Sequence, residues 1–158
     1  MIRGLMQVGR PGRGFFAAGA LLAGAGALLV PFEAGAQSSG PKADVMVIHA
    51  TDCAAKKVDP AIGEAPPLKY NCYALLERKS MTLVKGQPAT TSLPNNRTFQ
   101  LTHNDTKDGK FKVTAAISKD GGFNKLADIT AEPNKPFTVG GFAHGNGGAI
   151  VLTIRIVP

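Results

Sequence analysis

From residue 44 onward, apolar and polar residues tend to alternate along this chain, which is the pattern of β-strands that bury one face. Two stretches, 110–118 and 149–157, show it most clearly. A shift of one residue would expose every apolar side chain in such a strand, so we expect the register of both to be firmly fixed. Their inward positions are Phe111, Val113, Ala115 and Ile117 in the first, and Ile150, Leu152, Ile154 and Ile156 in the second.

Further strands are expected wherever short apolar runs stand between turn residues. Asp108-Gly109 is a hairpin signal, because glycine accepts the positive φ of tight turns. The glycine-rich residues 140–148 predict a bulge followed by a hairpin turn. Residues 51–68 contain three prolines and predict a loop. The remaining expected strands are 45–50, 72–84 (divided in two at the charged residues 77–79), 90–93, 98–102, 123–129 and 137–139.

These elements predict an all-β fold, since no segment has the periodicity of an amphipathic helix. Short connections favour antiparallel pairing, because parallel strands need long crossovers. We therefore expect a small antiparallel β-sandwich of seven to nine short strands. It is immunoglobulin-like only in the broad architectural sense, because the chain has no tryptophan and so lacks the Cys–Trp–Cys signature.

The N-terminal 36 residues have a different composition. Three arginines precede an apolar run at residues 15–30, and Ala34-Gly35-Ala36 follows. That order is typical of a secretory signal peptide, with cleavage expected before Gln37. The alternative is a retained transmembrane anchor, since residues 15–32 just reach the length that spans a bilayer.

The expected organisation is therefore a signal peptide at 1–36, a flexible segment at 37–43 and a single β-sandwich domain at 44–158. We predict an exported protein, secreted to the periplasm or the extracellular space, with no membrane span after cleavage. An exported chain with two cysteines favours one disulfide, Cys53–Cys72. The alternative, a pair of metal-binding or redox thiols, is disfavoured because 19 residues separate them, far from a C-x-x-C spacing.

After cleavage the chain would carry 15 Lys and Arg against 10 Asp and Glu, a net charge of +5. The lysines are scattered rather than clustered with aromatic residues, which predicts a solvated surface and no nucleic-acid partner.

No catalytic or metal-binding motif stands out. His49, His103 and His144 lie at least 41 residues apart and form no ligand-spacing motif. Adjacent strands could still bring His49 and His103 together. No serine sits in a nucleophile elbow. We therefore expect no enzyme activity, no cofactor and no metal.

Three classes of function remain, and an enzyme is the least favoured. The leading hypothesis is a non-enzymatic module that binds another envelope or cell-surface protein, or forms part of such an assembly. Its expected contact is the proline-containing loop, with Lys57 and Ile62, because a pre-ordered loop loses little entropy on binding. The alternative is a glycan- or small-ligand-binding β-sandwich. The loop residues offered for that role are Tyr70, Tyr73, Phe142 and His144.

Overall fold

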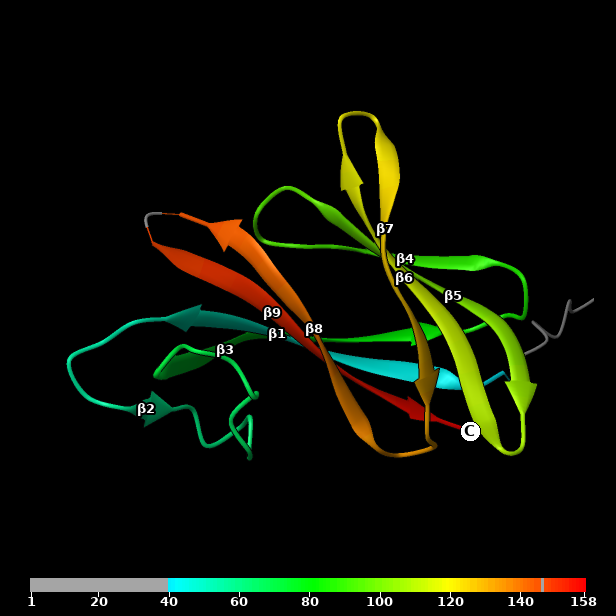
Figure 1. The fold of residues 1–158 in the computed structure, drawn as a ribbon, viewed down its shortest axis with the longest axis horizontal. Helices are drawn as coiled ribbons and strands as arrows, with labels where there is room; N and C mark the ends of the chain where they lie inside the picture. Colours follow the sequence, from blue (N-terminus) through cyan, green and yellow to red (C-terminus); the bar gives the residue numbers. More distant parts are fainter. Residues whose placement is uncertain (1–39, 146) are drawn as a thin grey trace, which may run out of the picture. The chain divides into compact units, whose positions relative to one another are not determined.

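The computed structural model describes residues 40–145 and 147–158, which form nine strands in two sheets (Figure 1). The expectations for the signal peptide lie outside the described residues. The strands are β1 (Lys42–Thr51), β2 (Lys57–Val58), β3 (Cys72–Thr82), β4 (Pro88–Ser92), β5 (Thr98–Lys107), β6 (Lys110–Lys119), β7 (Gly122–Ala131), β8 (Pro136–His144) and β9 (Gly148–Val157).

The first sheet has the order β2-β3-β1-β9-β8 and the second the order β4-β5-β6-β7. The first and last long strands, β1 and β9, are neighbours along their whole length. All pairs are antiparallel except the two-residue pairing of β2 with β3. The all-β sandwich predicted from the alternation is confirmed.

The main core lies between the facing sides of the two sheets. It joins residues of β1, β3, β8 and β9 to residues of β5, β6 and β7 in one buried cluster. The four aliphatic residues predicted to point inward from β9 are all 0% exposed, and the four from β6 are also buried. The predicted registers of these two strands are confirmed. Burying such side chains is the main favourable term in the stability of the fold.

Two hairpins of the second sheet close with tight turns of the predicted kind. Asp108 and Gly109, between β5 and β6, have φ of 53° and 71°. Asp120 and Gly121, between β6 and β7, have φ of 51° and 82°. Two successive positive φ values match the right-handed twist of the flanking strands, which explains why Asp-Gly occupies both turns.

The described strands are longer than the short strands that we expected, and six of them have ten or eleven residues. β1 begins at Lys42, so the last two residues of the segment expected to be flexible belong to the sheet. Residues 72–82 form one strand where two were expected. Pairing with β1 continues on both sides of a bulge at Leu76, which absorbs the charged stretch without breaking the ladder.

A second, smaller core lies on the opposite face of the first sheet. Ile48, Val151 and Tyr73 bury their side chains there beneath the irregular segment between β1 and β3, with Ile62 and Ala50. That segment contains β2 and two turns, one with a hydrogen bond from the Ile62 amide to the Asp59 carbonyl (3.0 Å). The first sheet is thus covered on both faces, by the second sheet and by this loop.

Within residues 40–145 and 147–158, no helix has the length and hydropathy needed to cross a membrane.

Candidate functional site

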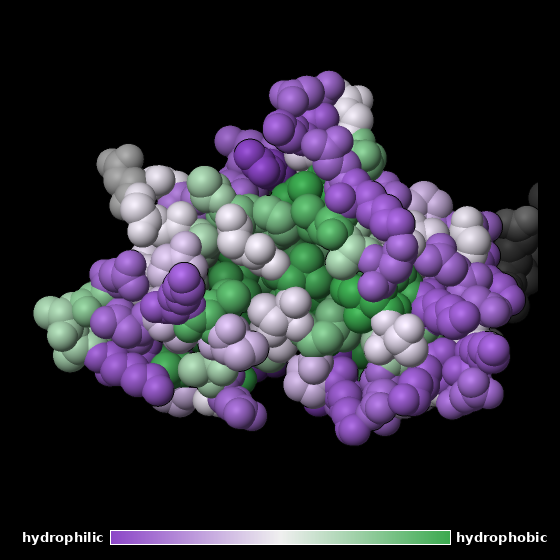
Figure 2. Space-filling view, viewed as in Figure 1, coloured by the Kyte–Doolittle hydropathy of each residue, from purple (hydrophilic) through white to green (hydrophobic). Residues whose placement is uncertain are grey.

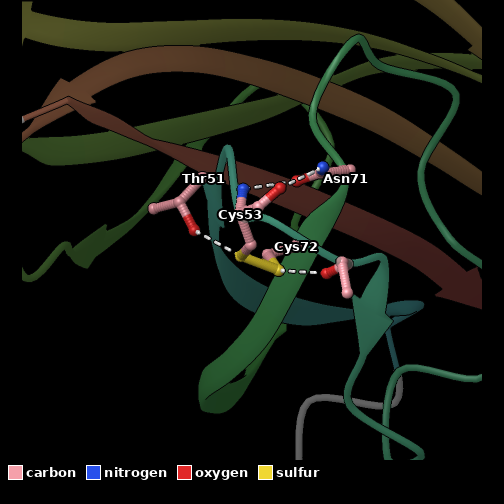
Figure 3. Close-up of a disulfide and its surroundings, with 5 residues drawn as sticks. Thr51, Cys53, Asn71 and Cys72 are labelled. Atoms are coloured by element: carbon pink, nitrogen blue, oxygen red, sulfur yellow. Dashed lines mark hydrogen bonds between the residues drawn. A yellow bond between two sulfur atoms is a disulfide. The ribbon is translucent and has the colours of Figure 1, made fainter.

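The end of the first sheet that carries β2 lies beyond the strands of the second sheet (Figure 1). The Cys53–Cys72 disulfide fastens the irregular loop there, with Cα atoms 5.9 Å apart, as predicted. The side chain of Asn71 points at the backbone of Cys53 (Figure 3). Its Oδ1 accepts from the Cys53 amide and its Nδ2 donates to the Cys53 carbonyl, both at 2.6 Å. These bonds prolong the β1–β3 pairing by one step beyond Thr51 and Cys72.

The rest of the loop is held by polar contacts with β3. The Asp59 carboxylate accepts from the amides of Ala61 (2.9 Å) and Leu75 (3.4 Å). The Tyr73 hydroxyl lies 3.2 and 3.1 Å from the carbonyl oxygens of Pro66 and Leu68, to which it donates. Burial raises the pKa of that hydroxyl above its ordinary value, so it stays protonated. The loop is thus tied to the first sheet by side-chain hydrogen bonds as well as by the disulfide.

A hollow of about 460 Å³ opens beside the disulfide. We call it the disulfide hollow. Its polar groups are His49, Thr51, Lys57 and Asp59, and the remaining lining comes from both cysteines and their neighbours. His49 and Thr51 lie on the same face of β1 as the core residue Val47, because side chains alternate along a strand. The hollow therefore continues the inner face of the sheet past the end of the core.

The structure brings together two histidines that no sequence motif joins. The rings of His49 on β1 and His144 on β8 have centroids 5.1 Å apart and planes at 85°. The strand between them is β9, where Gly148 pairs with His144. A Cβ at residue 148 would lie only 2.2 Å from His49 Nε2, so the glycine leaves the space in which that imidazole rests. The third histidine, His103, is in the second sheet and packs on Phe111.

The residues predicted as binding candidates are dispersed. Lys57 is exposed at the disulfide hollow. Ile62 is only 8% exposed and belongs to the second core, so the structure places it in the protein interior and not on an open contact surface. Tyr73 is buried in the same core, with Tyr70 packed against it. Phe142 lies in the main core. Of the ligand-binding candidates, Tyr70 and His144 stay partly exposed, and His144 lies beside His49.

Strands β7 and β8 form a second candidate surface. Each is the last strand of its sheet, so among the described residues one backbone edge of each is unpaired. Ile129 of β7, and Phe137 and Val139 of β8, pack against the core but stay partly exposed. Figure 2 shows hydrophobic residues in the middle of this face, between hydrophilic rims. We call this surface the β7–β8 side.

An exposed leucine marks β7 as well. Leu126 is the extra residue of a bulge opposite Ala115 and Ala116 and is 38% exposed. Phe123, near the tip of the same hairpin, is 46% exposed. No sequence signal distinguished these residues, because the alternation alone does not say which strand ends a sheet.

Apart from the buried Tyr73, the titratable groups with shifted pKa values lie on the surface. Hydrogen bonds from Lys135 and Lys110 lower the pKa of Glu132 to about 2. Bonds from Lys125 and Thr114 lower the pKa of Asp128. Within the part of the chain that the structure describes, no three His, Cys, Asp or Glu side chains group to hold a metal ion.

No family model, curated protein or solved structure matches this chain. Function must therefore be argued from the surfaces described above.

Proposed function

We propose that this chain is an exported, non-enzymatic β-sandwich module that binds another protein of the cell envelope or cell surface. One observation carries the proposal: β7 and β8 have free backbone edges on the same side of the sandwich, with partly exposed apolar side chains between them. Free edges are pairing templates, and proteins usually cover or blunt them when they are not used. The disulfide supports the exported location, because such bonds persist in oxidising compartments.

The partner fits as an extended segment that adds a strand to β7. In this mode the backbone hydrogen bonds supply affinity and apolar side chains fill the surface alongside. Alternate side chains of the segment would pack on Ile129, Phe137 and Val139, and the exposed Leu126 lies on the same edge strand. The opposite edge of the second sheet, β4, has five residues against the ten of β7, so it offers a much shorter template.

The non-enzymatic part of the proposal rests on how the shifted pKa values arise. Catalytic groups owe perturbed pKa values to burial and to neighbours within a cleft. Here the lowered pKa values of Asp105, Asp128 and Glu132 come first from hydrogen bonds with surface lysines, one each for Asp105 and Asp128 and two for Glu132.

A photo-crosslinking residue at position 126 tests the proposed contact in living cells. Leu76 is a matched control, because it is also a bulge leucine and is 40% exposed, but on β3. We expect an envelope protein to crosslink at 126 and not at 76. In affinity purification, the Leu126→Lys variant should no longer recover the envelope protein that the native chain recovers. The Leu76→Lys variant should still recover it. Equal crosslinking at both positions, or recovery unaffected by Leu126→Lys, would contradict the proposal.

The disulfide hollow favours a second candidate, a small ligand. Its volume falls in the range of ligand sites, and Lys57 supplies a positive charge beside the hydroxyl of Thr51. Screening of small anionic metabolites and oligosaccharides by ligand-observed NMR tests it. Binding that Lys57→Ala removes would support this candidate, whereas binding unchanged by that substitution would place the ligand elsewhere.

A further inference from the structure

His49 and His144 form a pair in which one buried polar atom lacks a hydrogen-bond partner among the described residues. Among the described residues, His49 Nε2 is buried and has no hydrogen-bond partner. Buried polar atoms in proteins are nearly always paired with protein or water, so such an atom calls for an explanation. Nε2 lies over Gly148, on the strand between the two histidines, and therefore on the side of His49 that faces β8.

A second unpartnered acceptor lies close to His144. Asn95, in the turn between β4 and β5, donates through Nδ2 to the carbonyl of Ala143 (3.4 Å). That bond fixes the orientation of the amide, and its Oδ1 is then buried with no donor among the described residues. Two of the four buried side-chain atoms in this condition among the described residues thus belong to neighbours of His144: the ring of His49 contacts it, and Asn95 bonds to the residue before it. Both can offer a lone pair, and a bound cation would satisfy them.

We propose that His49 and His144 together bind one divalent transition-metal ion of the class that imidazole prefers, Cu²⁺ or Zn²⁺. Metal–nitrogen distances near 2.0–2.1 Å and a tetrahedral angle place two ligating imidazoles with centroids roughly 5 Å apart. The observed separation is 5.1 Å. His49 Nε2 lies over Gly148, and His144, partly exposed at the rim, is the residue of β8 that pairs with Gly148.

The ligand chemistry selects among metals. Neutral imidazole nitrogen suits Zn²⁺ and Cu²⁺, whereas Mg²⁺ and Ca²⁺ require clusters of oxygen ligands. Two protein ligands leave the other coordination positions to water or to a group from a bound molecule. His49 also lines the disulfide hollow, which lies on the opposite side of β1 from β8. Lys57 and Asp59 are the charged groups of the hollow, and their opposite charges leave it near neutrality.

Zinc titration of the exported chain, purified with an affinity tag that contains no histidine, provides the test. With ¹⁵N-labelled histidine, the ring resonances of His49 and His144 should move together at one equivalent of Zn²⁺. The ring of His103, in the other sheet, is the internal control and should not move. Mg²⁺ at the same concentrations should shift none of the three. Calorimetry with Zn²⁺ and Cu²⁺ should give one site per chain.

Two variants separate ligation from folding. His144→Asn changes a rim residue and should lower the affinity for both ions at least about tenfold, since even changes beyond the ligands cost that much. Gly148→Ala keeps both histidines but places a Cβ where His49 rests, and it should weaken binding similarly. Circular dichroism verifies that both variants are folded. Shifts of all three rings alike, no binding at millimolar Zn²⁺, or native affinity in folded His144→Asn would each overturn the proposal.

Discussion

Replacing Ile62 by alanine tests whether the proline-containing loop is part of the protein interior. From the sequence this residue is expected to be a contact for a partner, and replacing an exposed contact residue leaves stability nearly unchanged. In the structure its side chain is 8% exposed and packs in the second core with Ile48, Tyr73 and Val151. The two views predict opposite results, so one measurement decides between them.

The size of the effect follows from the burial. Ile62→Ala removes three carbon groups, each worth about 0.8 kcal/mol when buried. With more than nine-tenths of the side chain covered, the transfer term is about 2 kcal/mol, at the lower end of the range for isoleucine-to-alanine changes in cores. A loop at the surface can relax into part of the space left behind, so we add no cavity term. Such a loss is a large share of the stability of a typical domain.

Urea unfolding followed by far-ultraviolet circular dichroism measures this loss. A slope of about 1–3 kcal/mol per molar urea converts it into a midpoint lower by roughly 1 M. Glu64→Ala is the matched control, because Glu64 is exposed in the same loop; its free energy of unfolding should stay within about 0.5 kcal/mol of the native value. Equal midpoints for Ile62→Ala and Glu64→Ala would refute the inference that the loop packs on the first sheet.

Four other predictions follow from the same features. Terminal sequencing of the exported protein should begin at Gln37. Thiol labelling of the unfolded, unreduced chain should find no free cysteine, and reduction of the Cys53–Cys72 bond should lower stability by up to about 3 kcal/mol. Ile154→Asp puts a carboxylate at a position that is 0% exposed and should abolish the cooperative unfolding transition. Glu132 should titrate near pH 2 by carboxyl NMR, so its contribution is present above about pH 4.5 and is lost as pH falls toward 2, and Lys135→Met should raise its pKa.

Much of the fold could be predicted because each strand carries its own signal. The alternation in β6 and β9 gives the buried face directly, and the Asp-Gly pair gives the turn that joins β5 to β6. A hairpin is a local structure, so neighbouring residues contain the information needed to find it. The disulfide was predictable for a related reason, since an exported chain with two cysteines offers a single pairing.

The candidate sites were harder to predict because they depend on which strands are neighbours. His49 and His144 are 95 residues apart, and only the order β1-β9-β8 brings them together. We had considered His49 with His103, but those residues are in different sheets. From the sequence, Gly148 belongs to a stretch interpreted as a bulge and turn. In the structure, the missing side chain of Gly148 leaves the space that the His49 imidazole occupies. The free edges of β7 and β8 are likewise properties of the whole arrangement.

The sequence contains a signal for the burial of Ile62 that its interpretation as a contact residue did not use. Residues 45–48 and 149–152 are apolar without interruption, and such runs are typical of strands buried on both faces. Alternation is typical of a strand with one face exposed to solvent. An uninterrupted apolar run instead predicts that both faces of β1 and β9 are buried, so a second element must pack on the outer face. The segment between β1 and β3 supplies it, and its apolar side chains are therefore used in folding. We expect a partner to bind at β7 instead, because the side chains of β7 are mostly exposed and its outer edge is free among the described residues.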